Sequence, residues 1–297
     1  MSIETQRSTR PHLACEIAPD RVVAARASRN GGALEGCSSR SLRVGSVTPS
    51  LIAGNVGDPA ALRQAISETL GDVTDRTREV ITILPDSAVR VVLLDFDELP
   101  AKRQEADAMV RFRLKKALPF DVDQAAVSYD VRVRNGVTKV LSTIALRSVL
   151  DEYEGAVRDA GYNPGVVIPS MIAMLGTVQA NEPTLVVKVD SGTTTLAIVD
   201  SDQLLLFRTL ENPPGNQIDP EQLAADIYPS LIFFEDNYSV QVKKILVAGR
   251  ASSSLVGPAL QAQSGAQVSG IPGNGALASA ASGVPPEQLV GVAGALS

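Results

Sequence analysis

Residues 187–199 read Val-Lys-Val-Asp-Ser-Gly-Thr-Thr-Thr-Leu-Ala-Ile-Val, an apolar strand, a turn rich in hydroxyls and a returning apolar strand. Gly192 permits a tight turn because glycine adopts positive φ without steric cost. Backbone N–H groups and threonine hydroxyls could then converge on an anion, and Asp190 could hold Mg²⁺ through water. An ordinary hairpin, in which Asp190 and Thr193 bond their own turn, is the alternative interpretation.

The strands on either side of this turn belong to a meander that occurs twice in the chain. The expected strands are Leu13–Ile17, Arg21–Ala27 and Leu42–Val47 in the first copy, and Thr184–Val189, Thr195–Val199 and Gln203–Thr209 in the second. Apolar residues at helical spacing predict a helix after each copy, at Pro59–Leu70 and at Glu221–Phe234. The repetition indicates a weak internal duplication of an α/β unit.

The stretch between the two copies contains further strands and helices. A strand pair is expected at Glu79–Leu84 and Val89–Leu94, and a hairpin around Asn135-Gly136. The longest helix of the first half is expected at Pro100–Leu118, because Pro119 disfavours helix before it. Two further helices are expected, at Arg147–Ala160 and Pro169–Gly176, and two further strands, at Val166–Ile168 and Lys244–Val247. A connector is expected at Asn181–Pro183. The stretch Ser264–Pro286 gives no clear pattern of helix or strand.

Composition excludes several classes of protein. The 297 residues are 44% hydrophobic and 20% charged, which is typical of a globular chain with a sizeable core, and the net charge of -6 argues against a nucleic-acid surface. No apolar run approaches the ~18 residues that span a bilayer, so no direct membrane insertion is expected. Cys15 and Cys37 are the only cysteines and His12 is the only histidine, so cysteine-rich zinc sites and histidine-based catalytic dyads are not expected.

The hydroxyl-rich turn resembles the second phosphate loop of the actin and sugar-kinase superfamily, Asp-x-Gly-x-x-Thr. The first phosphate loop corresponds to Glu16-Ile17-Ala18, where Asp-Ile-Gly is usual, and the adenosine motif corresponds to residues 245–252. The nucleotide-binding residues that this resemblance implies are Glu16, Asp190, Ser191, Gly192, Thr193, Thr194, Gly249 and Arg250, with Mg²⁺ held at Asp190 through water.

Within that superfamily the chain resembles the PilM family of type IV pilus assembly proteins. The motifs that carry this resemblance are Ile81-Thr82-Ile83-Leu84-Pro85-Asp86, Leu99-Pro100, Leu118-Pro119-Phe120-Asp121 and Tyr129-Asp130-Val131. Their order and spacing fit the family, and the resemblance extends from Leu13 to the Ala- and Gly-rich end at residues 287–294.

The resemblance implies an α/β fold with two actin-like lobes, a duplicated ribonuclease H-like architecture, and a small inserted subdomain. The implied organisation is a polar tail at 1–11, a first lobe at 12–178 with the insertion at about 79–146, and a second lobe at 183–297. The last helix is expected to pack back towards the first lobe.

The resemblance also implies a function. The chain would be a cytoplasmic scaffold, peripheral at the inner membrane, whose groove receives the N-terminal cytoplasmic tail of a PilN-like membrane protein and which contacts other components of the pilus inner-membrane complex. The residues expected in this groove are Arg90, Asp95 and Phe120.

Departures from the nucleotide motifs predict a pseudo-ATPase rather than an enzyme. Pro19 has no N–H to offer a phosphate, and Ala18 adopts glycine conformations less readily. Arg250 would place a bulky side chain beside the expected adenine and ribose, although its guanidinium could instead pair with a phosphate. The expected cofactor is therefore none, with ATP and Mg²⁺ as the less favoured possibility.

Two alternatives stay open. The chain could be an active actin-like ATPase with an ATP-driven switch or polymer, which the turn at Asp190 favours. It could also be the cytoplasmic domain of a GspL-like general secretion protein, a class that normally continues into a transmembrane helix, which this sequence does not contain before Ser297.

Overall fold

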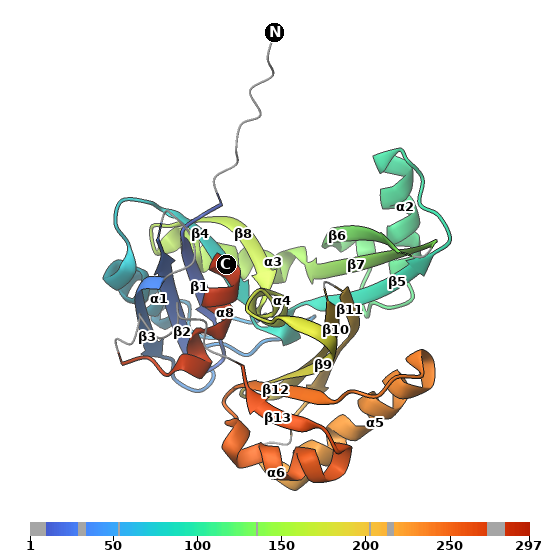
Figure 1. The fold of residues 1–297 in the computed structure, drawn as a ribbon. Helices are drawn as coiled ribbons and strands as arrows, with labels where there is room; N and C mark the ends of the chain where they lie inside the picture. Colours follow the sequence, from blue (N-terminus) through green and yellow to red (C-terminus); the bar gives the residue numbers. More distant parts are fainter. Residues whose placement is uncertain are drawn as a thin grey trace.

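The structure is a computed structural model that describes residues 10–28, 34–52, 54–134, 136–201, 203–212, 217–271 and 283–297. Most of the predicted tail at 1–11 lies outside these residues. The described residues form two five-stranded sheets and one three-stranded sheet (Figure 1).

The first lobe is built on the sheet β3-β2-β1-β4-β8. Its strands are β1 (Leu13–Ile17), β2 (Arg21–Ala27), β3 (Leu34–Ser41), β4 (Glu79–Leu84) and β8 (Asn163–Pro169). β1 and β4 are buried on both faces, as expected for central strands with apolar residues throughout. Helices α1 (Pro59–Val73) and α3 (Arg147–Asp159) pack on one face, and α4 (Ser170–Leu175) and α8 (Pro286–Leu296) cover the other.

The second lobe repeats the topology of the first. Its sheet has the order β11-β10-β9-β12-β13. The strands are β9 (Ala180–Val189), β10 (Thr193–Ser201), β11 (Gln203–Glu211), β12 (Lys244–Gly249) and β13 (Gln267–Gly270), and the helices are α5 (Pro220–Tyr238) and α6 (Ser253–Ser264). In both sheets three antiparallel strands are followed by two strands parallel to the central one. The predicted duplication is therefore confirmed.

The strand registers fix which residues are equivalent in the two lobes. Glu16 on β1 lies beside Val23 and Ile83, whereas Lys188 on β9 lies beside Thr195 and Ala248. β2 starts five positions after Glu16, and β10 starts five positions after Lys188. Glu16 and Lys188 therefore occupy equivalent positions, although their charges are opposite.

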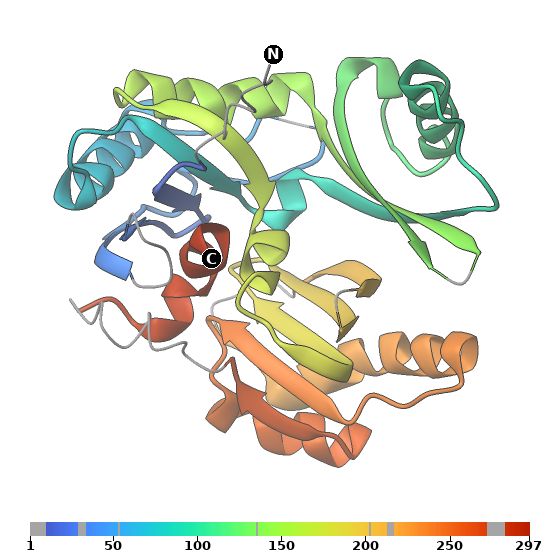
Figure 2. The same cartoon turned by 45° about the horizontal axis from the view of Figure 1, so that its top comes forward.

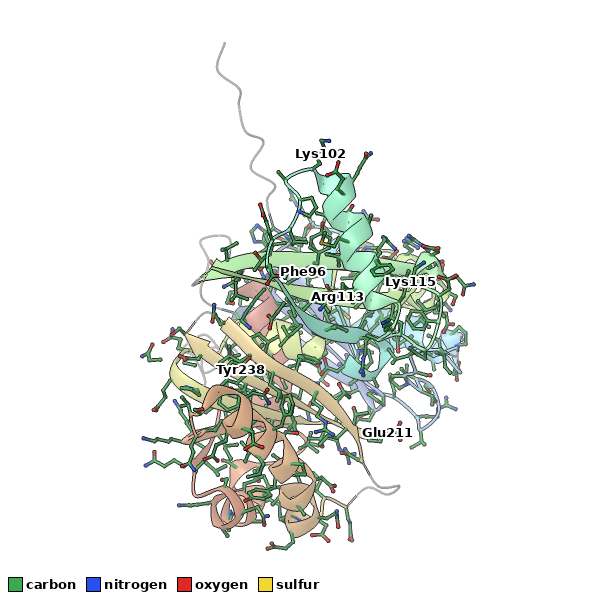
Figure 3. The ribbon with its side chains drawn as sticks, turned by 90° about the vertical axis from the view of Figure 1, so that its right-hand side faces the viewer. Phe96, Lys102, Arg113, Lys115, Glu211 and Tyr238 are labelled. Carbon is green, nitrogen blue, oxygen red and sulfur yellow. The ribbon has the colours of Figure 1, made fainter. Side chains whose placement is uncertain are left out.

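A small subdomain lies between β4 and α3 in sequence. Its sheet β5-β7-β6 contains β5 (Arg90–Phe96), β6 (Ala125–Arg134) and β7 (Val137–Leu146), and α2 (Arg103–Leu114) covers one face. Two single turns of 3₁₀ helix, Asp86–Ala88 and Val122–Gln124, precede β5 and β6. Figure 3 shows α2 standing clear of the second lobe, with Arg113 beside Phe96 of β5.

Several predicted elements need correction. The third strand is Leu34–Ser41 rather than Leu42–Val47, and it is an edge strand with mainly polar residues. β4 and β5 do not pair with each other, because β4 lies between β1 and β8 in the first lobe. The three-stranded sheet therefore begins at Arg90, not at Glu79.

Other boundaries also differ from the prediction. Helix α2 has 12 residues and is shorter than α1, which has 15. The expected connector at 181–183 lies inside β9, which begins at Ala180. Helix α6 and strand β13 were not predicted, because Ser, Gly and Ala dominate that stretch and Pro258 interrupts the helical pattern.

Helices α4 and α8 lie side by side between the two five-stranded sheets, as Figures 1 and 2 show. Their apolar side chains join a cluster that includes Val186 and Ala197 of the second lobe. Two glycines permit this approach, because a Cβ on Gly176 would lie 2.3 Å from the Gly294 carbonyl oxygen, and one on Gly294 would lie 2.1 Å from that of Ala173. Among the described residues, no helix is both long and apolar enough to cross a membrane.

Replacing Gly294 by Ala is expected to lower the free energy of unfolding by about 1–3 kcal/mol, because the added methyl group forces α8 away from the α4 backbone. Thermal unfolding would measure the loss. The matched control is Gly155→Ala in α3, where a Cβ would meet no atom within 4 Å, so helix propensity alone should make the protein slightly more stable. Equal effects of the two substitutions would show that the close packing of α4 and α8 contributes nothing.

Candidate functional site

The turn between β9 and β10 satisfies most of its own polar groups. The Asp190 N–H donates to the Thr193 carbonyl at 2.8 Å, and Gly192 has φ +100°. Asn212 donates from its backbone N–H to the Gly192 carbonyl at 2.8 Å and from Nδ2 to the Asp190 carbonyl at 3.0 Å, while the Thr194 hydroxyl donates to Asn212 Oδ1 at 2.7 Å. The turn thus shows the features of an ordinary satisfied hairpin.

A buried lysine occupies the centre of the space between the lobes. Lys188 is 4% exposed, and its ammonium contacts the Asp190 carboxylate and lies 3.4 Å from Glu16 Oε1. Burial alone lowers the pKa of Lys188, but the carboxylates of Asp190, Glu16 and Asp86 outweigh burial and raise the pKa above its ordinary value. Burial likewise raises the pKa of Asp190, yet Lys188 and Arg21 outweigh it and the pKa is lowered. The ammonium and the Asp190 carboxylate therefore stay charged at neutral pH.

Two arginines complete a set of cross-lobe ion pairs. Arg21 Nη2 of the first lobe lies 3.8 Å from Asp190 Oδ1 of the second, and Arg21 Nη1 also bonds Asp20 Oδ1 at 2.8 Å. Arg250 of the second lobe has its Nε 3.7 Å from Asp20 Oδ2 of the first. These contacts, together with those of Lys188, are called the interlobe ion cluster below: Glu16, Asp20, Arg21, Lys188, Asp190 and Arg250.

Three residues support the cluster from the first lobe. The Ser170 hydroxyl donates to Glu16 Oε1, and a Cβ on Gly291 of α8 would lie only 2.3 Å from Glu16 Oε2. Asp86, in the 3₁₀ turn after β4, accepts a hydrogen bond from the Met171 N–H at 2.9 Å. Burial raises the pKa of Asp86 to about 6, although Lys188 opposes the rise.

Four of the eight residues predicted to bind nucleotide line a small cavity beside the cluster. The cavity has a volume of about 210 Å³, and Asp190, Gly192, Thr194 and Arg250 are among its lining residues. Asp219, which caps the start of α5, and Asp226 of α5 also line it. Its carboxylates therefore outnumber its single arginine, an arrangement that repels phosphate. Ser191 and Thr193 lie at the same turn without lining this cavity, and Glu16 is instead in the ion cluster.

Gly249 has a structural explanation of its own. It has φ +86°, and a Cβ there would lie 2.3 Å from the Val189 carbonyl oxygen, so the glycine allows β9 and β12 to approach each other. The Arg250 N–H then donates to that same carbonyl at 2.7 Å.

Among the described residues, no group of three or more His, Cys, Asp or Glu side chains is arranged to hold a metal ion.

A second, larger cleft of about 650 Å³ lies between the first lobe, the subdomain and the second lobe. Its lining comes from the loop at Pro49–Ile52, the turn and strand at residues 86–91, Pro119, and residues 192–193 and 207–212. Ile52 in this lining is 62% exposed, an apolar side chain left open to solvent. This region is called the subdomain cleft below.

The structure separates the three residues predicted to bind a partner. Arg90 is exposed and lines the subdomain cleft. Asp95 lies near the other end of β5 and pairs with Lys139 at 3.0 Å, and Phe120 is half-buried against the core beneath α2. Arg90 and Asp95 are five residues apart, so their side chains leave opposite faces of the strand.

Sequence reasoning did not assign a role to Lys188, Arg21, Asp86, Ser170 or Asn212. One signal was available, since a lysine between valines in a buried strand requires a charged partner. Its partner Glu16 is 172 positions earlier in the numbering of the chain, so no local pattern could identify the pair.

No family model matches the sequence, and neither does any curated protein. Solved structures do match. A chain of the PilM-PilN type IV pilus biogenesis complex is 20% identical with a TM-score of 0.79, and the match covers 97% of this chain and 98% of that one.

Two further structures share the fold at lower similarity. Ethanolamine utilization protein EutJ from Carboxydothermus hydrogenoformans has a TM-score of 0.54 at 13% identity, covering 96% of this chain and 89% of that chain. The cytoplasmic domain of EpsL, an inner membrane component of the type II secretion system of Vibrio cholerae, has a TM-score of 0.52 at 11% identity, covering 80% and 83%. With the duplicated sheet topology, these likenesses establish that the chain has the two-lobed actin-like α/β fold with a small inserted subdomain.

Proposed function

We propose that this protein is a PilM-like scaffold of type IV pilus assembly, located in the cytoplasm and held at the inner membrane by a PilN-like partner. The observation that supports this best is the structural likeness to a chain of the PilM-PilN complex over 97% of the length. The succession of PilM-like motifs in the sequence supports it independently, because it does not depend on the fold.

The positions of those motifs suggest where the partner binds. The segment Ile81–Asp86 contains the last four residues of β4 and ends at Asp86, where the 3₁₀ turn begins, and the Leu-Pro-Phe segment after α2 contains Pro119. Asp86 and Pro119 both line the subdomain cleft. Two residues that carry the resemblance thus line this cleft, which we propose as the site for the N-terminal tail of the PilN-like partner.

The chemistry of the subdomain cleft suits an extended peptide. β5 and β11 are edge strands of their sheets, and residues of both line the cleft. Edge strands present unpaired backbone groups, which an extended segment can use for main-chain hydrogen bonds. Ile52 offers an apolar contact, and Arg90 offers a cation for an acidic side chain of the tail.

We further propose that the protein does not hydrolyse ATP. The Lys188 ammonium already contacts the carboxylate of Asp190, the residue expected to hold Mg²⁺ through water. The adjacent cavity contains more carboxylates than cations, so it gives little stabilisation to a triphosphate. The scaffold would then act through its partners and not through nucleotide turnover.

The test is fluorescence anisotropy of a labelled peptide, the N-terminal cytoplasmic tail of the PilN-like partner, titrated with this protein with and without Mg-ATP. Saturable binding that ATP does not change is expected. Arg90→Glu should weaken it about tenfold, or about 1.4 kcal/mol, through loss of a charged contact. Asp95→Asn, on the opposite face of β5, is the matched control and should leave binding unchanged.

Other outcomes have distinct meanings. A peptide that fails to bind in either condition would contradict the pilus proposal. Binding that requires Mg-ATP would instead support an ATP-driven switch, the first alternative from the sequence.

A further inference from the structure

Three ion pairs of the interlobe ion cluster join one lobe to the other. Glu16 of the first lobe faces Lys188 of the second at 3.4 Å, Arg21 of the first faces Asp190 of the second at 3.8 Å, and Asp20 of the first faces Arg250 of the second at 3.7 Å. Each lobe therefore contributes both acidic and basic groups to this interface.

The arrangement follows from the duplicated fold. Glu16 and Lys188 occupy equivalent positions on the central strands β1 and β9, and these strands approach each other at the ends where their turns begin. Here two equivalent positions of the duplicated fold meet between the lobes. A like-charged pair there would repel, whereas the opposite charges of Glu16 and Lys188 attract.

Burial strengthens these ion pairs and makes their loss costly. The side chains of Glu16, Lys188, Asp190 and Arg21 are 3%, 4%, 8% and 7% exposed, so water and salt screen them little. If the lobes moved apart, Glu16 would keep Ser170 but lose its cation, and Asp190 would lose Arg21. An open arrangement thus leaves charged groups without a partner in the opposite lobe.

The apolar contacts between the lobes do not set their angle in the same way. The cluster formed by α4, α8 and the second sheet contains Met171, Met174, Val186, Ala197 and Val290. Such packing is non-directional, and methionine adapts to small displacements. Ion pairs depend on distance and orientation, so they restrict the rotation that the apolar contacts permit.

We infer that the interlobe ion cluster is a latch that keeps the two lobes closed without a nucleotide. In this latch the Lys188 ammonium supplies the positive charge between the carboxylates of the two lobes. The latch is independent of the proposed pilus function. One consequence does rest on that function: because both lobes line the subdomain cleft, closure keeps the peptide site formed.

The experiment measures the distance between two spin labels, one on each lobe. Val44→Cys and Leu255→Cys place labels on side chains that are 99% and 49% exposed. Cys15 and Cys37 are buried, and burial raises the pKa of Cys15 to about 12, so the native thiols react slowly with the label. The nucleotide-free protein should give one narrow distance distribution, and adding Mg-ATP should not shift it.

Variants then test the latch itself. Glu16→Gln removes the first-lobe carboxylate that pairs with Lys188 and leaves Asp190 in place. Arg250→Gln removes the more exposed pair with Asp20, a milder change in case Glu16→Gln fails to fold. In both variants we expect a second population of label-to-label distances, and we expect this population to be more abundant in Glu16→Gln than in Arg250→Gln. Asp95→Asn, which breaks an ion pair inside the subdomain, is the matched control and should leave the distribution narrow.

Two results would overturn the inference. One is a broad distribution of label-to-label distances in the protein with all latch residues intact, if it narrows only when Mg-ATP is added. That result would make the nucleotide responsible for closure. The other is a narrow, unshifted distribution in both latch variants when circular dichroism shows them folded. Neither result depends on whether the pilus peptide binds, so failure of the latch and failure of the proposed function can be told apart.

Discussion

Replacing Lys188 by Met is expected to lower the free energy of unfolding by about 3–5 kcal/mol, the range for removing one partner of a buried ion pair. Methionine fills a similar volume, so the loss comes mainly from charge. The variant leaves the Glu16 carboxylate, which is 2% exposed, with no cation in contact, and leaves Asp190 with Arg21 alone at 3.8 Å.

Urea unfolding at pH 7 measures this loss, with Lys139→Met as the matched control. Lys139 pairs with Asp95 at 3.0 Å, but the two side chains are 30% and 63% exposed. Surface pairs of this kind contribute about 0–1 kcal/mol. Similar losses in the two variants would mean that burial gives the Lys188 pairs no special strength.

A double variant separates the ion pair from other roles of Lys188. If the loss in Lys188→Met comes from stranded carboxylates, adding Glu16→Gln should recover part of it, because the amide needs no counter-charge. Additive losses would instead indicate that each residue stabilises the fold through separate contacts.

The parts of the fold that were predicted correctly are those with a strong local signal. The apolar runs of β1, β4, β9, β10 and β12 identified the central strands, and Asn135-Gly136 identified the β6–β7 hairpin, where Gly136 has φ +79°. β3 gave no such signal, because the strand reads Leu-Glu-Gly-Cys-Ser-Ser-Arg-Ser and is held by its neighbour β2. Its strand conformation comes from tertiary pairing, which overrides a weak intrinsic propensity.

Pairing between strands was predicted less well than the strands themselves. β4 and β5 are close in sequence and were expected to form a hairpin, yet a turn of 3₁₀ helix at Asp86–Ala88 directs β5 into another sheet. β4 is apolar on both faces, which is typical of a central parallel strand and not of a two-stranded hairpin.

The candidate site was only partly predictable, because its chemistry is shared between distant segments. Alternation along β9 places Val187 and Val189 in the core of the second lobe and turns Lys188 to the other face. What covers that face is Glu16 of β1, some 170 positions away, with α8 behind it. A motif read along one strand cannot show whether its charged residue meets solvent, a nucleotide or another lobe.

Replacing Asp86 by Asn is expected to raise the free energy of unfolding by about 3 kcal/mol at pH 7 to 8, the equivalent of a shift of about two pKa units. Burial raises the pKa of Asp86 to about 6, against an ordinary value of 3.8, even though the nearby Lys188 ammonium opposes the rise. The folded protein therefore holds the Asp86 proton more tightly than the unfolded chain does. This contribution to stability is complete below pH 3.8 and is lost as the pH rises through 6.

Asparagine avoids that loss because it does not ionise, and its Oδ1 can still accept the Met171 N–H. The advantage of Asp86→Asn should thus be small near pH 4, grow up to pH 6 and stay constant above it in urea unfolding curves. Asp72→Asn is the control of opposite sign, because a hydrogen bond from Ser38 lowers the pKa of Asp72 and the ionised carboxylate stabilises the parent. The stability deficit of this variant relative to the parent should therefore be smallest at low pH and grow as the pH rises. If Asp86→Asn is less stable than the parent at every pH, attraction between Asp86 and Lys188 outweighs the burial of the carboxylate, and Asp86 belongs to the latch itself.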